Sequence, residues 1–199
     1  MKKHVIVLGG GASGIMAAIT AAESGAHVTV LESNNKIGKK LYATGNGRCN
    51  FTNLNMNPEC FRTDSDDSYY SVIKRFGCDD TIEFFEKTGL NHKDRDGYVY
   101  PNNDQAASLV HMLEKKIDSL NIQVNLEEKC TDFVFGNNGE IEVTTNKGKY
   151  IADRLIVACG LKASPKTGSD GNLLKLLSKK GYQFSPVVPA LVPLVFKSK

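Results

Sequence analysis

The 199-residue sequence has no tryptophan, only six prolines and no long apolar segment. Its N-terminal apolar stretch covers only residues 5–8, whereas a signal peptide needs about 7–15 apolar residues and a membrane span about 20. We therefore expect a cytoplasmic protein that does not enter a membrane. The formal net charge is only +3, from 25 basic and 22 acidic side chains. This charge predicts no stable binding to nucleic acid, and the composition leaves the oligomeric state open.

The cysteines are few and poorly placed for disulfide or metal chemistry. There are five, with no CxxC motif and no histidine at zinc-binding spacing: Cys49, Cys60, Cys78, Cys130 and Cys159. We expect reduced thiols and no metal site. Disulfide reductases carry a redox cysteine pair five residues apart just after their ribose-binding carboxylate, but Cys49 stands alone. A dithiol relay is therefore not expected.

Glycine, in contrast, is abundant. The 18 glycines cluster at residues 9–14, 38–47 and 160–171. The first cluster, from Gly9 to Gly14, reads GGGASG and fits the GxGxxG motif. It follows the apolar strand expected at 5–8 and opens a small-residue helix expected at 12–24, which Gly25 ends.

This motif predicts a dinucleotide-binding turn. Gly9 allows the turn out of the strand, Gly11 lets the backbone approach a pyrophosphate, and Gly14 allows the helix to pack on the strand. A second apolar strand, 28–31, ends at Glu32, where a carboxylate accepts a hydrogen bond from a ribose hydroxyl. The same carboxylate repels a 2′-phosphate, which excludes NADP at this loop and leaves FAD or NAD.

The rest of the chain is expected to alternate helices and strands. The helices are expected at 67–76, 79–87, about 104–119 with Asn103 or Asp104 as the cap, and 172–180. Strands are expected at 122–126, 130–135, 140–145, 149–152 and 155–158, with a hairpin over 91–100 that turns at Asp96-Gly97. We therefore predict an α/β fold of Rossmann type, with a parallel sheet and an antiparallel three-strand meander.

The meander decides between the two dinucleotides. It comes directly before the last parallel strand, which ends at Cys159-Gly160. At this point the sequence resembles flavoproteins with two dinucleotide-binding domains, in which a strand ending in Ala-Thr-Gly follows such a meander. This resemblance favours FAD. Because there is no second GxGxxG, NAD(P)H is expected to bind only transiently as the reductant.

A longer motif carries a narrower resemblance. The segment 38–53 reads GKKLYATGNGRCNFTN, Tyr100-Pro101 precedes the helix expected at about 104–119, and residues 189–194 read PALVPL. Together they resemble the BaiN/RdsA-type NAD(P)/FAD-dependent oxidoreductases, also called aminoacetone-oxidase-like flavoproteins. The resemblance covers residues 5–194 and about the first half of the family's usual length. It implies an FAD-binding domain at 1–185 and the start of an inserted substrate domain at 186–199, in a truncated fold.

The resemblance also implies an activity. In one branch of the family it is the reduction of a uridine of 23S ribosomal RNA to dihydrouridine, which is our leading expectation. An oxidase of a small amine or ketone such as aminoacetone is the enzyme alternative, and an inactive fragment or dinucleotide-binding module is the other. The substrate is accordingly a small molecule or ribosomal RNA.

The segment around Cys49 suits a loop whose backbone lies against a flavin ring. Arg48 is expected to stabilise negative charge on reduced flavin, and Cys49 is a candidate proton donor, with a packed structural thiol as the alternative. His92 and His111 are weaker candidates. The residues expected to contact FAD are Gly9, Gly11, Ala12, Ser13, Gly14, Glu32, Lys40, Gly45, Asn46, Gly47, Asn50, Cys130 and Gly160.

Flavoproteins of this type end with a strand that returns to the FAD domain and closes in Gly-Asp. The segment 168–171 comes too early in the chain to be that strand, and the apolar run 187–196 has no partner of its own. We therefore expect an incomplete FAD site, with the pyrophosphate and adenosine contacts present and part of the wall around the flavin ring missing.

Overall fold

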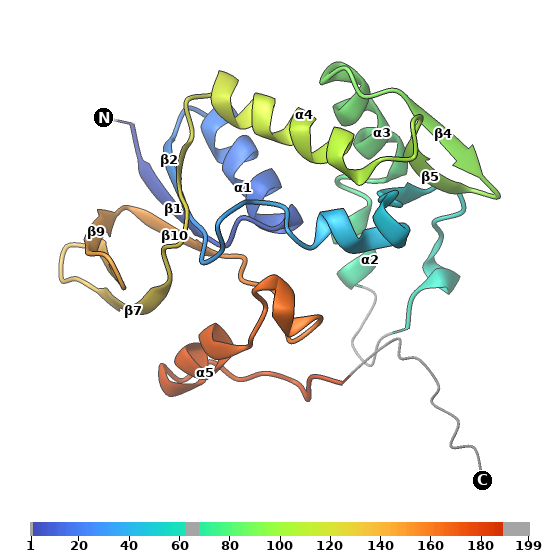
Figure 1. The fold of residues 1–199 in the computed structure, drawn as a ribbon. Helices are drawn as coiled ribbons and strands as arrows, with labels where there is room; N and C mark the ends of the chain where they lie inside the picture. The colour runs from blue at the N-terminus through green and yellow to red at the C-terminus, as the bar shows by residue number, and fades with distance from the viewer. Residues whose placement is uncertain (1, 63–67, 189–199) are drawn as a thin grey trace, which may run out of the picture.

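The computed structural model describes residues 2–62 and 68–188. At its centre lies a parallel sheet in the order β10-β1-β2-β6 (Figure 1). Its strands are β1 (His4–Leu8), β2 (His27–Leu31), β6 (Gln123–Asn125) and β10 (Arg154–Val157). All four expected parallel strands are present. The carboxyl ends of β1, β2 and β10 lie along one edge of the sheet, where ligands bind in open α/β folds.

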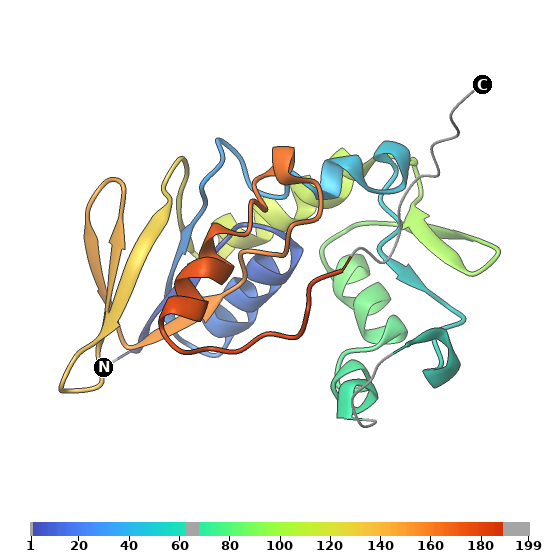
Figure 2. The same ribbon diagram turned by 90° about the horizontal axis from the view of Figure 1, so that it is seen from below.

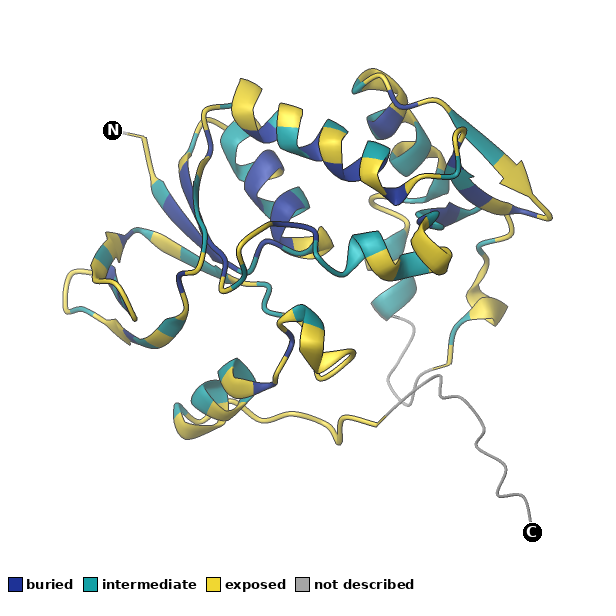
Figure 3. Cartoon of the chain, in the orientation of Figure 1, coloured by how far each residue is buried: buried dark blue, intermediate teal, exposed yellow. Residues whose placement is uncertain are grey.

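Alternate side chains of β1 point to opposite faces of the sheet, and each face has its own cover. Val5 and Val7 belong to the core cluster that includes the buried faces of α1 (Ala12–Glu23) and α4 (Ala106–Ser119). Ile6 and Leu8 belong to a second cluster, on the side of the antiparallel meander. Figure 3 shows the buried residues gathered in β1, β2, α1 and the inner side of α4.

The meander consists of β7 (Cys130–Phe135), β8 (Ile141–Thr145) and β9 (Lys149–Ala152), as expected from the sequence. Phe133 and Val143 are buried against Ile6 and Leu8 in the second core cluster. Helix α5 (Asn172–Lys179) packs on the same cluster through its leucines. The central sheet is thus covered by helices on one face and by the meander and α5 on the other.

A second lobe lies beside the sheet (Figure 2). It contains β3 (Thr52–Asn53), η2 (Pro58–Cys60), α2 (Ser68–Ile73), α3 (Cys78–Lys87), β4 (His92–Arg95) and β5 (Tyr98–Pro101). Its sheet has the order β3-β5-β4. The expected hairpin is present and turns through Asp96 and Gly97, with φ of +52° and +86°. Phe51 and Phe85, whose ring centroids are 5.0 Å apart, join this lobe to the helical core.

The sequence misplaced one helix start. Helix α4 begins at Ala106, and its N-cap residue is Gln105 rather than Asn103 or Asp104. Asp104 has a φ of +56° and its carboxylate bonds Lys93 and Arg95, so it is not available to cap the helix. Asn103 lies two residues before the N-cap position, and its side chain accepts the N–H of Gln105 rather than one from the first turn of the helix.

Three expectations fall at the limits of the described residues. Most of the apolar run 187–196 and nearly all of the proposed second domain, 186–199, lie outside them, as does residue 67 at the start of the first expected helix of the second lobe. Within residues 2–62 and 68–188, no helix is long and apolar enough to cross a membrane.

Candidate functional site

A cleft of about 420 Å³ opens at the carboxyl ends of β1, β2 and β10. The glycine-rich turn 9–13 forms its floor, and residues 31–34 and 39–44 form one side. Residues 128–130 and 158–160 continue the wall, and residues 167–173 cover it. Glycines of the first and third clusters therefore line one cleft, and the second cluster contributes Lys39, Lys40, Leu41 and Thr44.

The glycines of the turn are of two kinds: those at which a Cβ would clash with the protein, and Gly11, at which it would not. A Cβ at Gly9 would lie 2.6 Å from the Ala158 carbonyl oxygen, and one at Gly14 would lie 1.8 Å from the Gly9 oxygen, so no side chain fits at either position. A Cβ at Gly10 would meet Ile37 at 2.7 Å. At Gly11, in contrast, no protein atom lies within 4 Å. Packing alone therefore does not require a glycine at Gly11, and the space in front of it is open to a bound group.

Helix α1 presents its N-terminus to this open space. Gly11 is the N-cap residue and supplies no side chain to bond the first backbone N–H groups, and the first turn contains no acidic residue. Ala12 and Ser13, which are exposed, line the cleft. Free N–H groups and the positive end of the helix dipole make this position suited to a phosphate.

Glu32 lies at the end of β2 and is 7% exposed. Its Oε2 accepts the Gly10 backbone N–H at 2.6 Å, and its Oε1 accepts the backbone and side-chain N–H groups of Asn34 at 2.7 and 2.6 Å. The described residues therefore give Oε2 a single donor, which leaves it able to accept a hydroxyl group of a ligand. Glu32 also lines the cleft, as a ribose-binding carboxylate must.

Two lysines supply positive charge to the cleft without carboxylate partners among the described residues. Lys39 Nζ donates to Asn34 Oδ1 at 3.0 Å, and Lys40 Nζ donates to Ser169 Oγ at 2.6 Å. Lys129, on the opposite wall, pairs with Asp170 at 2.8 Å. The Lys40 and Lys129 contacts tie residues 167–173 over the cleft. The sequence did not predict that this loop lines the site, because Lys129 and Asp170 are 41 residues apart and no local motif links them.

The far wall is lined by two thiols and a buried carboxylate. Burial raises the pKa of Cys130 to about 11 and also raises the pKa of Cys159. Glu128, which is 3% exposed, accepts hydrogen bonds from Thr145 Oγ1 at 2.7 Å and from the Tyr150 hydroxyl at 2.8 Å. Glu128 therefore braces this wall, a role that its position in the sequence does not reveal.

The predicted flavin-side loop begins in the cleft and leaves it. Leu41 and Thr44, in η1 (Leu41–Gly47), line the cleft, but the residues from Gly45 to Asn50 do not. Gly45 and Asn46 interrupt the helical turns with φ of +55° and +54°. Asn50 donates to the Thr52 and Val99 carbonyls at 2.9 and 3.0 Å, and so ties the loop to the second lobe.

Cys49 occupies the core rather than the cleft. It is 1% exposed and belongs to the cluster that joins the parallel sheet to the second lobe. Burial raises the pKa of its thiol, which is therefore protonated at neutral pH. Its proton-donor role stays a prediction.

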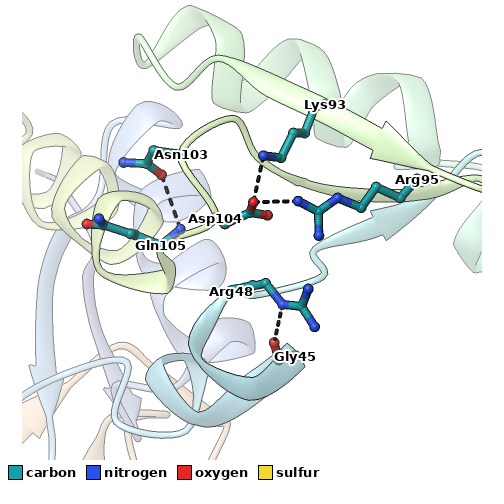
Figure 4. Close-up of polar contacts among 7 residues, drawn as sticks. All are labelled: Gly45, Arg48, Lys93, Arg95, Asn103, Asp104 and Gln105. Carbon is teal, nitrogen blue, oxygen red and sulfur yellow. Dashed lines mark hydrogen bonds and ion pairs between the residues drawn. The ribbon is translucent and has the colours of Figure 1, made fainter.

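Arg48 lies on the far side of the same loop. Its Nε donates to the Gly45 carbonyl at 3.2 Å, and its guanidinium carbon is 5.7 Å from the centre of the Tyr100 ring. Figure 4 shows Arg48 facing Arg95, Lys93 and Asp104 of the second lobe. The weaker candidates are placed elsewhere: His92 pairs with Glu86, and His111 with Glu114 on the surface of α4.

The cleft accordingly brings together eight of the expected cofactor contacts: Gly9, Gly11, Ala12, Ser13, Glu32, Lys40, Cys130 and Gly160. Gly14 supports them from behind, whereas Gly45, Asn46, Gly47 and Asn50 lie beyond the cleft. Within the described ranges, no three His, Cys, Asp or Glu side chains gather closely enough to hold a metal ion.

The comparison with known families agrees with this arrangement. The HI0933-like protein Rossmann domain family matches residues 3–188. The chain belongs to that family. The expected resemblance and fold class are thereby confirmed.

Relatives that match nearly all of this HI0933-like chain carry two kinds of name. A 3-dehydro-bile acid delta(4,6)-reductase of Clostridium scindens is 43% identical over 193 residues, which are 96% of this chain and 47% of the relative. A ribosomal RNA dihydrouridine synthase of Haemophilus influenzae is 26% identical over 196 residues, 96% of this chain and 49% of the relative. The chain therefore spans about half the length of the curated relatives it matches.

Solved structures share the fold at lower sequence identity. An open-conformation flavocytochrome c3 fumarate reductase has a TM-score of 0.60 at 16% identity, over 89% of this chain and 40% of that one. Thermovibrio ammonificans THI4 has a TM-score of 0.57 at 16% identity, over 92% of this chain and 64% of that one. The fold of this HI0933-like chain is that of FAD-dependent oxidoreductases.

The residues of the cleft fit FAD. The open space at Gly11 and the N-terminus of α1 would hold the pyrophosphate, and Glu32 would hold the adenosine ribose. Lys39 and Lys40 would add charge opposite the phosphates.

Proposed function

We propose that this chain forms the FAD-binding part of an NAD(P)H-driven reductase that saturates a carbon–carbon double bond conjugated to a carbonyl group. One observation carries the cofactor assignment: the glycine turn leaves open space at Gly11, in front of α1, while Glu32 closes the cleft beside it. The reaction class is supported by what the relatives' two names have in common. The 4,6-diene of a 3-oxo steroid and the 5,6 double bond of uridine are both conjugated to a carbonyl.

The reaction requires a hydride and a proton. Bound FAD would supply the hydride for one carbon of the double bond, with NAD(P)H as the source of that hydride. The neighbouring carbon must take a proton. We keep Cys49 as the candidate donor, since burial keeps its thiol protonated. Because Cys49 is 1% exposed, this role requires the substrate to gain access to a side chain that the core covers.

The substrate we favour is a small molecule rather than ribosomal RNA. The bile-acid reductase is 43% identical to this chain, whereas the dihydrouridine synthases are 26% identical. The net charge of +3 also supports a small substrate, because binding to RNA draws on extended positive surfaces.

Turnover tests the proposal directly. The purified chain, loaded with FAD, is mixed with NADH or NADPH and one of three substrates: a 3-oxo-4,6-diene steroid acid, a uridine-containing fragment of 23S ribosomal RNA, or aminoacetone. We expect nicotinamide oxidation only with the steroid, and loss of its conjugated-diene absorbance. Dihydrouridine in the RNA would move the assignment to that substrate. Oxygen consumption with aminoacetone would replace the reductase by an oxidase.

The proton donor is tested separately. We expect Cys49→Ala to retain FAD and to lose turnover, with the residual rate rising as the pH falls because solvent then supplies the proton. Cys60→Ala, at an exposed cysteine outside the cleft, is the matched control. Normal FAD content together with normal turnover in Cys49→Ala would end the assignment and leave the thiol as a packing residue.

A further inference from the structure

Two arginines flank one tyrosine ring outside the cleft. The guanidinium carbon of Arg48 is 5.7 Å from the centre of the Tyr100 ring, and that of Arg95 is 5.9 Å from it. The two guanidinium groups therefore lie within about 12 Å of each other. They come from different segments, the end of η1 and strand β4, and Figure 4 shows their guanidinium groups on the same side of the loop.

Asp104 holds the cationic side chains of β4 in place. Its Oδ2 accepts from Lys93 Nζ at 2.6 Å and from Arg95 Nη2 at 2.5 Å. Lys93 and Arg95 are two residues apart and share one face of the strand, while Asp94 lies on the other face. The hydrogen bond from Lys93 lowers the pKa of Asp104, which keeps the carboxylate charged at neutral pH.

The cluster retains positive charge and unused donors. It contains three cations and one carboxylate, so its net charge is +2, and Arg48 has no carboxylate partner among the described residues. Arg95 uses only Nη2 and Arg48 only Nε in the hydrogen bonds of the described residues. The remaining N–H groups form planar forks, which match the two oxygens of a carboxylate.

The cluster is connected to the cofactor cleft through η1. Leu41 and Thr44 at the start of this segment line the cleft, and Arg48 follows its end. At Gly45 a Cβ would lie 3.5 Å from the Tyr100 ring, so the backbone of the loop touches the cluster. A molecule held at Tyr100 therefore lies against the loop that borders the FAD site.

We propose that Arg48 and Arg95 bind the carboxylate of the substrate and that Tyr100 packs against the apolar body next to it. Lys93 and Asp104 are positioning residues. This inference rests on the proposed function and specifies its substrate as a small organic acid. It assigns Arg48 to the substrate in place of the flavin charge predicted from the sequence.

The surroundings favour a single acidic group over a nucleic acid. The hairpin that carries Arg95 also carries the exposed carboxylates Asp94 and Asp96, which repel the neighbouring phosphates of a polynucleotide. One tyrosine ring offers little stacking surface, whereas single-stranded RNA uses a series of aromatic platforms.

Calorimetric titration of the purified chain tests the acid site. The probes are cholate below its micelle concentration, its uncharged methyl ester, and a ten-nucleotide oligouridine. We expect Arg95→Gln to raise the Kd for cholate about tenfold. Arg154→Gln is the matched control, because that exposed arginine bonds only the Asp153 carbonyl among the described residues, and it should leave the Kd unchanged. The methyl ester should bind about tenfold more weakly than cholate and should not respond to Arg95→Gln.

Several results would overturn the acid site. These are equal binding of cholate and its ester, an unchanged Kd in Arg95→Gln, or oligouridine binding that is tighter than cholate and is lost in Arg95→Gln. If Arg95→Gln lowers the melting temperature, Arg95→Lys takes its place. That variant keeps the charge but loses the fork, and we expect an intermediate Kd.

Turnover separates this inference from the reductase assignment. The enzyme could reduce a 3-oxo-4,6-diene steroid acid and its methyl ester at equal rates and with equal KM. That result would overturn the acid site alone. Tight, Arg95-dependent cholate binding without reduction of either diene would overturn the reductase alone.

Discussion

The Glu32 carboxylate accepts the Gly10 backbone N–H at 2.6 Å, and so joins the end of β2 to the glycine turn that follows β1. This bond holds the acidic group over the open space at Gly11. The two features that the sequence separates by 22 residues therefore form one site.

Replacing Glu32 should weaken FAD binding. Glu32→Gln keeps the shape but removes the charge and one acceptor, and a hydrogen bond to a charged group contributes about 1.5–3 kcal/mol. We expect the Kd for FAD to rise by about tenfold or more in calorimetric titration. Glu59→Gln, at an exposed glutamate of η2, serves as the control. An unchanged Kd for FAD in Glu32→Gln would show that Glu32 does not bind the ribose.

Two glycines of the turn should respond differently to alanine. A Cβ at Gly11 meets no protein atom within 4 Å, and its φ of −83° suits alanine. Gly11→Ala should therefore melt within a few degrees of the parent chain but lose most of its FAD affinity. Gly14→Ala should fold poorly, because its Cβ would lie 1.8 Å from the Gly9 oxygen. Thermal unfolding and FAD titration measured on both variants check the pair. FAD affinity retained in Gly11→Ala would show that the cofactor does not lie there.

The thiols of the cleft should react slowly with alkylating agents. At pH 8, a pKa of about 11 leaves roughly one Cys130 in a thousand as thiolate. We expect iodoacetamide to modify exposed Cys60 first and Cys49 and Cys130 last, as followed by mass spectrometry of peptides. Because Cys130 and Cys159 line the cleft, added FAD should slow their modification further and leave Cys60 unchanged. If FAD slowed the alkylation of Cys60 but not that of Cys159, the result would contradict the binding of FAD in this cleft.

The ion pair over the cleft should depend on pH. The hydrogen bond from Lys129 lowers the pKa of Asp170. The stability that this ion pair adds to the loop is therefore present above the ordinary aspartate pKa of about 3.9, and it is lost as the pH falls through the lowered pKa. At pH 7, Asp170→Asn should speed amide hydrogen exchange in residues 165–171. Near pH 2.5, the two proteins should exchange alike once intrinsic rates are corrected. Asp118→Asn on α4 is the control, and equal exchange at pH 7 would remove this role.

Local sequence patterns predicted most elements because each depends on neighbours in the chain. The apolar run of β1, the left-handed turn at Asp96-Gly97 and the three strands of the meander need no distant partner to be recognised. The start of α4 was misplaced for the opposite reason. Asp104 resembles a cap in sequence, but Lys93 and Arg95 engage its carboxylate from a hairpin that ends before it.

The residues of the candidate site likewise fall into those that a local motif predicts and those that it does not. Gly9, Gly11 and Glu32 are recognisable because the βαβ unit is a local motif. Three other features depend on side chains that meet only after folding. They are the wall formed by Glu128, the Lys129–Asp170 pair, and the two arginines beside the Tyr100 ring, Arg48 and Arg95. Nor does the spacing of the flavin-side loop reveal that it leaves the cleft after Thr44.

The position of β10 has a consequence for folding kinetics. This strand pairs with β1 in the register Val5↔Arg154, whereas β1 and β2 are close in the sequence. Contacts between distant residues close large loops and form late in folding. Ala158, Cys159 and Gly160, which follow β10, therefore reach the cleft only in the final stage of assembly. The gain of flavin binding during refolding should lag behind the gain of helical structure, and should report when the parallel sheet is complete.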